Sequence, residues 1–109
     1  MKSYDLYGSR SGTLEELRAA VESVLGVEFV AHRSDYVGDY YKTAGFVGET
    51  IAIQPNHLAE GDEAEVLEPE FADRPVLVYV NDTERGDEIG VRLLDIPGLE
   101  LLRRDTRPD

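Results

Sequence analysis

The most regular hydrophobic pattern in the chain is helical. Apolar residues recur at intervals of three and four positions between Leu14 and Leu25, and charged residues occupy the opposite face. Thr13 precedes this stretch and Glu16 follows Thr13 by three positions, which is the spacing of a capping box. Gly26 stands where a glycine commonly ends a helix. The pattern predicts a helix over residues 14–25.

Alternating apolar and polar residues predict strands over much of the remaining chain. The predicted strands are 3–8, 27–32, 36–43, 49–54 and 99–103. Gly45 and Gly48 bracket the expected hairpin turn between 36–43 and 49–54. A continuous apolar run, Val76–Val80, is typical of a central strand that is covered on both faces.

Two segments have less regular patterns. Residues 55–72 show no clean periodicity, so a short helical turn and an irregular loop both remain open. In 83–96, Ile89 and Leu93 fit one face of a helix, yet they also fit the alternation of a strand. We expect a helix over 87–95, although its glycines weaken a helix by about 1 kcal/mol each relative to alanine.

The order of the predicted elements defines the fold class. One strand, one helix, four strands, a second helix and a last strand predict an α+β fold. We expect an antiparallel or mixed sheet of about five to six strands with two helices on one face. A chain of 109 residues suits a single domain, 1–109. Both ends of the chain, 1–2 and 105–109, are expected to fray, and the second belongs to a polar tail that begins at Arg104.

Charge narrows the range of partners. The chain carries 23 acidic and 11 basic residues, for a net charge of −12. Such a field repels nucleic acids and anionic membranes, and it attracts basic proteins. We therefore expect neither direct nucleic-acid binding nor membrane binding. Solubility alone is the simpler explanation of the same charge.

Composition also points to a compartment. The chain has no cysteine, whereas small secreted domains commonly need disulfides. Its first residues, MKSYDLYGSR, contain no apolar core of a secretory signal. No apolar run approaches the roughly 20 residues that a membrane helix needs. These features favour the cytoplasm.

The sequence contains no motif of catalysis or cofactor binding. No serine lies in a G-x-S-x-G pattern, and Gly8–Gly12 lacks the spacing of a phosphate loop. His32 and His57 have no metal-binding spacing, and the acids after Gly61 do not follow the order of a calcium loop. We therefore expect no enzyme activity, no cofactor and no metal.

Acidic residues concentrate in one segment, Glu60–Asp73. Seven of its fourteen residues are acidic and none is basic. The segment either is a solvated loop or receives the basic side chains of a partner. Its partner-binding candidates are Glu60, Asp62, Glu63, Glu65, Glu68 and Glu70.

A second candidate surface combines tyrosine with aspartate. Its residues are Asp35, Tyr36, Asp39, Tyr40 and Tyr41. On a strand, Tyr36 and Tyr40 share one face, while Asp39 and Tyr41 share the other. Tyrosine is common in interface hot spots, but a cross-strand aromatic ladder that only stabilises the sheet would use the same residues.

One stretch resembles a known type of protein. The run F-V-A-H-R-S-D-Y-V-G-D-Y-Y, residues 29–41, is similar to the centre of small immunity proteins from bacterial polymorphic-toxin and contact-dependent-inhibition systems. Glu49–Asn56 and Val76–Val80 follow in similar order, so the resemblance spans about 13–104. It implies a cytoplasmic protein without activity of its own, which neutralises a cognate toxin protein. The resemblance also implies a basic toxin, because many such toxins are nucleases or other basic proteins. The resemblance identifies no contact residues.

Two other classes of function remain open. An acidic regulatory module, or a mimic of nucleic acid, would occupy the basic groove of a partner and bind with strong salt dependence. A small enzyme or small-ligand domain would need a cavity with convergent polar groups.

Overall fold

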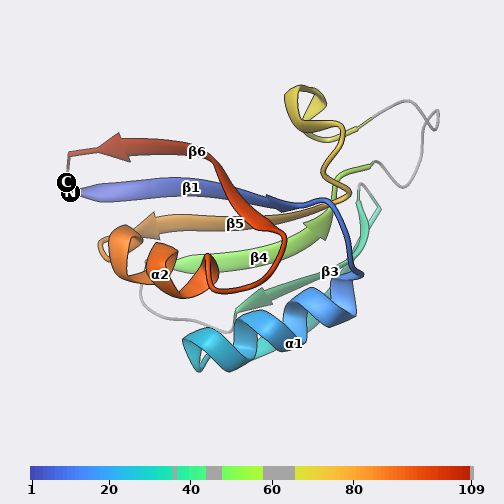
Figure 1. Ribbon diagram of the computed structural model, residues 1–109, viewed down its shortest axis with the longest axis horizontal. Helices are drawn as coiled ribbons and strands as arrows, with labels where there is room; N and C mark the ends of the chain where they lie inside the picture. The colour runs from blue at the N-terminus through green and yellow to red at the C-terminus, as the bar shows by residue number, and fades with distance from the viewer. Residues whose placement is uncertain (36, 44–47, 58–65, 109) are drawn as a thin grey trace.

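The computed structural model of the chain describes residues 1–35, 37–43, 48–57 and 66–108. Within these residues, six strands form one sheet in the order β2-β3-β4-β5-β1-β6, and all neighbours are antiparallel (Figure 1). The strands are β1 (Lys2–Ser9), β2 (Phe29–Ser34), β3 (Gly38–Thr43), β4 (Thr50–Pro55), β5 (Val76–Thr83) and β6 (Leu99–Arg107). The helices are α1 (Leu14–Leu25), α2 (Gly86–Leu93) and the short 3-10 turn η1 (Pro69–Phe71). The predicted α+β class is confirmed.

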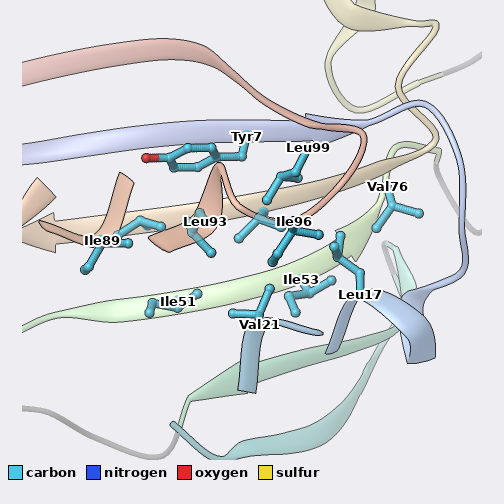
Figure 2. Close-up of a cluster of buried hydrophobic side chains, with 12 residues drawn as sticks. Tyr7, Leu17, Val21, Ile51, Ile53, Val76, Ile89, Leu93, Ile96 and Leu99 are labelled. Carbon is cyan, nitrogen blue, oxygen red and sulfur yellow. The ribbon is translucent and has the colours of Figure 1, made fainter. Parts of the chain in front are cut away.

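Both α-helices cover the same face of the sheet (Figure 1), and the core lies beneath them (Figure 2). Leu17 and Val21 of α1 pack there with Ile89 and Leu93 of α2. The sheet contributes Tyr7, Ile51, Ile53, Val76, Val78 and Val80. Alternate residues of β4 and β5 therefore point into this core, and the residues between them point to the opposite face.

Helix α1 follows its sequence signals closely. The Oγ1 atom of Thr13 accepts a hydrogen bond from the Glu16 backbone N–H at 3.1 Å. Gly26 ends the helix with φ of 68°, in the left-handed region that glycine adopts without a steric cost. The predicted bounds, 14–25, are confirmed.

Helix α2 is also confirmed, although its glycines disfavour a helix locally. Gly86 and Gly90 face β1, where a Cβ atom on Gly86 would lie 2.5 Å from the Ser3 Oγ. A Cβ atom on Gly90 would lie 3.0 Å from the Tyr7 hydroxyl. The glycines therefore let α2 approach the sheet closely, and the apolar contacts of Ile89 and Leu93 outweigh the local cost.

The expectation of frayed ends is wrong for the described residues. Strand β6 continues to Arg107, which pairs with Lys2 at the start of β1, so the two termini lie side by side (Figure 1). The predicted strand 27–32 is displaced by two residues, because β2 runs from Phe29 to Ser34 opposite β3. In both cases, pairing with a neighbouring strand sets where the strand begins and ends. The hydrophobic pattern of a polar segment does not predict such pairing.

An ion pair holds the charged half of β6 in place. The Asp5 carboxylate on β1 has no exposed surface, and the Arg104 guanidinium contacts both of its oxygens, at 2.9 and 3.0 Å. Arg104 also donates to the Asp87 carboxylate and to the Gly86 carbonyl of α2. One side chain thus joins both strands to the helix that covers them.

Replacing Arg104 tests this role. We expect Arg104→Ala to lower the free energy of unfolding by about 3 kcal/mol, because the buried Asp5 carboxylate loses its cation. Arg107→Ala is the matched control, since it breaks an exposed pair with Asp105 on the same strand and should cost less than about 1 kcal/mol. Urea denaturation measures both. Equal losses would show that the Asp5–Arg104 pair has no special importance.

Candidate functional site

The face of the sheet opposite the helices carries the candidate site. Ala52 and Gln54 alternate with the core residues of β4, so they lie on this helix-free face. Tyr40 and Asn81 extend the same face across β3 and β5. Together they help to line a hollow of about 340 Å³. The hollow, called the Tyr40 hollow below, is lined by Ser34, Val37, Tyr40, Lys42, Thr50, Ala52, Gln54, Leu67 and Asn81.

The Tyr40 hollow lies where the two segments that contain the predicted surfaces come together, and among the described candidate residues Tyr40 lines it. Leu67 belongs to the acidic segment Glu60–Asp73, and Tyr40 belongs to the tyrosine–aspartate segment. Both residues line the same hollow. The described end of the acidic segment therefore lies beside the tyrosine strand, although Leu67 and Tyr40 are 27 positions apart in the sequence.

Asn56 anchors the acidic segment at this position. Its buried side chain accepts a hydrogen bond from the Glu68 N–H at 2.7 Å and donates one to the Phe71 carbonyl at 2.8 Å. Asn56 follows directly after β4, so the clamp ties residues 68–71 to the end of a central strand. The predicted helical turn within 55–72 is the η1 turn, which begins at Pro69 inside this clamp.

Glu68 is bound within the molecule. Its carboxylate accepts hydrogen bonds from the Tyr79 hydroxyl at 2.8 Å and from the Arg103 guanidinium at 3.2 Å. Its side chain is only 18% exposed. Burial and the adjacent Glu68 carboxylate raise the pKa of Tyr79, because both disfavour the tyrosinate. Glu68 therefore fixes the segment to the sheet and has little charge to offer a partner, whereas Glu70 is exposed.

Tyr40 and Tyr41 point to opposite faces of β3, as the alternation predicts. The Tyr40 ring stacks on His32 of β2, with the ring centroids 5.3 Å apart and the planes inclined by 19°. This is the cross-strand aromatic pair that the sequence left open, but Tyr40 also lines the hollow, so the two roles coexist.

Tyr41 lies on the helix side, packed against the core. Its hydroxyl donates to the Glu15 carboxylate of α1 at 2.7 Å, and the Arg18 guanidinium lies 5.7 Å from its ring centroid. Hydrogen bonds from Arg18 and, to a smaller extent, from Tyr41 lower the pKa of Glu15 to about 2. Tyr41 thus fastens α1 to the sheet, and it does not belong to the helix-free face.

The remaining candidates divide into two groups. Asp35 is exposed in the turn after β2, and Asp39 is exposed on β3 at 3.7 Å from Arg33. Five predicted residues lie outside the described part of the chain: Tyr36, Glu60, Asp62, Glu63 and Glu65.

A second hollow of about 360 Å³ adjoins the first on the helix-free face, because Asn81 lines both. Its residues include Tyr4, Tyr79, Arg103 and Arg107, which sequence reasoning missed. The Arg107 guanidinium lies 4.8 Å from the Tyr4 ring centroid. One signal was available: Tyr79 and Asn81 alternate with the core residues of β5 and therefore share this face, where Leu77 is buried, as expected of a strand covered on both sides.

In the described part of the chain, most lysine and arginine side chains form ion pairs with carboxylates of the same molecule. Nine of the eleven basic side chains lie within 4.0 Å of a carboxylate. The nine are Lys2, Arg10, Arg18, Arg33, Arg74, Arg85, Arg103, Arg104 and Arg107. The surface field is negative because 23 acidic residues outnumber 11 basic ones, and the ion pairs leave this excess unchanged.

A third hollow, of about 250 Å³, lies near the termini and the start of α2. It mixes cations with carboxylates, among them Arg85 and Asp87. In the part of the chain that the structure describes, no three histidines or carboxylates come together as metal ligands would. The described helices include none that is long and apolar enough to cross a membrane.

Two comparisons with known proteins found no match for the chain. No protein-family model matches the chain, and no curated protein matches it. The function must therefore be inferred from the geometry and charge of the helix-free face.

The opposite placement of the two tyrosines can be tested by substitution. We expect Tyr41→Ala to lower the melting temperature by several degrees, because it removes the contacts that fasten α1 to β3. Tyr40→Ala should lower it much less, since its main aromatic contact is the stack on His32. Thermal denaturation followed by circular dichroism measures both. The reverse order would contradict the assignment of Tyr41 to the core side.

Proposed function

We propose that this chain is an immunity protein, which binds a cognate bacterial toxin domain in the cytoplasm and neutralises it without catalysis. The observation that carries the proposal is the Tyr40 hollow, where the acidic segment and the tyrosine strand meet. A hollow between two such segments provides one continuous surface for a partner. The resemblance of residues 29–41 to small immunity proteins points in the same direction.

The chemistry of the helix-free face suits a protein partner. Tyr40, Tyr4 and Tyr79 lie along it, together with Arg103 and Arg107. Tyrosine and arginine are the residues most enriched in interface hot spots, along with tryptophan. Gln54 and Asn81 add amides that donate and accept hydrogen bonds. The strands hold these side chains on a rigid base, so little conformational entropy is lost on binding.

The negative field suits a basic partner. Attraction between an acidic protein and a basic one speeds their encounter and discriminates against acidic competitors. Leu67, which lines the Tyr40 hollow, belongs to the acidic segment Glu60–Asp73. We therefore expect the acids of this segment to steer a cationic surface toward the hollow.

Co-expression tests the proposed function. The chain and the toxin domain encoded beside its gene should elute from size-exclusion chromatography as one 1:1 complex, and the chain should restore growth to cells that express the toxin. Two separate peaks would contradict the proposal.

Substitution of Tyr40 locates the surface. We expect Tyr40→Ala to raise Kd for the toxin by about 30-fold, the effect of a hot spot of about 2 kcal/mol. Tyr41→Phe is the matched control, because it keeps the ring on the helix side and should leave Kd unchanged. An unchanged Kd for Tyr40→Ala would exclude the Tyr40 hollow as the centre of the interface.

Charge reversal separates local steering from net charge. Changing Asp62, Glu63 and Glu65 together to lysine should slow association by about tenfold, with little change in the dissociation rate. The control changes Glu16, Glu88 and Asp95 to lysine, which alters the net charge equally but on exposed residues in or next to the helices. Surface plasmon resonance at low salt compares the two. Equal slowing would show that the acidic segment contributes only its share of the net charge.

A further inference from the structure

The two edges of the sheet differ in how they are protected. Strand β6 forms one edge, and five of its nine residues are charged: Glu100, Arg103, Arg104, Asp105 and Arg107. Charged side chains on an edge strand oppose pairing with another chain. Strand β2 forms the other edge, and its sequence FVAHRS contains one charged residue, Arg33.

Strand β2 is also open to solvent. Its four central residues, Val30 to Arg33, are exposed, and the Val30 side chain is a large apolar group at 45% exposure. An exposed edge strand with so few charges is a template for a further strand.

The hydrogen bonds show which backbone groups of β2 point outward. In an antiparallel ladder, successive residues direct their N–H and C=O groups alternately to either side. The Ile51 N–H of β4 bonds the Thr43 side chain of β3, so the backbone of Ile51, and of Ile53 two residues on, faces β3. Tyr41 opposite Ile53 therefore faces β4, and Ala31 opposite Tyr41 turns its backbone groups away from β3.

The start of β2 gives the same answer. The Phe29 N–H does not bond β3, but donates to the Glu22 carboxylate of α1 at 2.9 Å. Phe29, Ala31 and Arg33 alternate along the strand, so all three direct their backbone groups to the outer edge. Glu22 occupies the first of these N–H groups, which leaves the outer edge around Ala31 and Arg33 for another strand.

Charge identifies the kind of strand that would fit. Glu28 and Asp35 are exposed at the two ends of β2, whereas the nearby Asp39 and Glu22 are paired with Arg33 and Arg18. A second copy of this chain would bring the same carboxylates and a net charge of −12 against them. A lysine-rich strand would meet opposite charges, and its β-branched residues would pack beside Val30.

We propose that the outer edge of β2 receives an extended, lysine-rich segment of a partner protein as a seventh strand, bonded to the backbone of Ala31 and Arg33. This inference rests on the proposed function, because it describes how the toxin or another basic partner would extend the same sheet. His32 of β2 stacks on Tyr40, so the added strand would lie next to the helix-free face.

A short peptide that alternates lysine with valine is the probe, and the same peptide with glutamate in place of lysine is its control. Amide hydrogen exchange, followed by NMR, reads the edge directly. At a peptide concentration about ten times Kd, exchange at Ala31 and Arg33 should slow by about tenfold. Exchange at Val30 and His32, which already face β3, should change much less. No binding, or no slowing at Ala31 and Arg33, would overturn the proposal.

Ala31→Pro removes one outward N–H, a substitution that an edge strand tolerates when the lost N–H faces solvent. It should weaken peptide binding by about tenfold, the effect of losing one backbone hydrogen bond with its desolvated partner. Ala31→Thr keeps the N–H and should bind as the unmodified chain does. Unchanged binding by Ala31→Pro would overturn the proposal, and the exchange experiment on the unmodified chain decides the matter if this variant fails to fold.

The peptide experiment is independent of the toxin experiment. If the peptide leaves the amides of Ala31 and Arg33 unprotected while the toxin complex forms, the edge proposal alone fails. If the peptide protects these amides while the chain and the toxin elute separately, the proposed function alone fails.

Discussion

Burial of one face of the sheet is the constraint on which the structure depends. Two short helices supply Leu17, Val21, Ile89 and Leu93, which cover the central strands on one side, and on the other side Leu6 and Leu77 are buried as well. The alternation of a strand then sends every second side chain to the opposite side. Tyrosines, amides and arginines occupy those positions, and the hollows that they line define the candidate site.

Polar contacts hold the remaining parts of the molecule to this sheet. Asp5 and Arg104 join β1, β6 and α2 in a place with little apolar surface. Asn56 ties the acidic segment to the end of β4, and Glu68 completes the attachment through Tyr79 and Arg103. Each bond of this kind satisfies a polar group that would otherwise be costly to bury, so these contacts also specify a single arrangement.

The net charge sets the electrostatics of the surface. The chain meets a partner as an anion because it has 23 acidic and 11 basic residues, a balance that the ion pairs leave unchanged. The proposed interface combines this field with a face that is less acidic and richer in tyrosine. Long-range charge would then bring a basic protein close, and short-range contacts at Tyr40 would hold it.

Local patterns in the sequence predicted those features whose causes are local. Apolar spacing and the caps at Thr13 and Gly26 predicted α1, and the period of a strand placed Tyr40 and Tyr41 on opposite faces. The alternating strands and the two helices predicted the α+β class, because each buries an apolar face that is visible in the sequence.

Only the tertiary structure decided how distant segments meet. Arg104 continues a strand because it binds Asp5, a residue 99 positions earlier in the sequence. Helix α2 contains Gly90 because Tyr7 of β1 lies too close to leave room for a larger residue. The hollow beside Leu67 and the open edge at β2 likewise depend on the order of the strands. The physical reason is the same throughout: hydrogen bonds and packing between distant residues can outweigh local preferences of about 1 kcal/mol each.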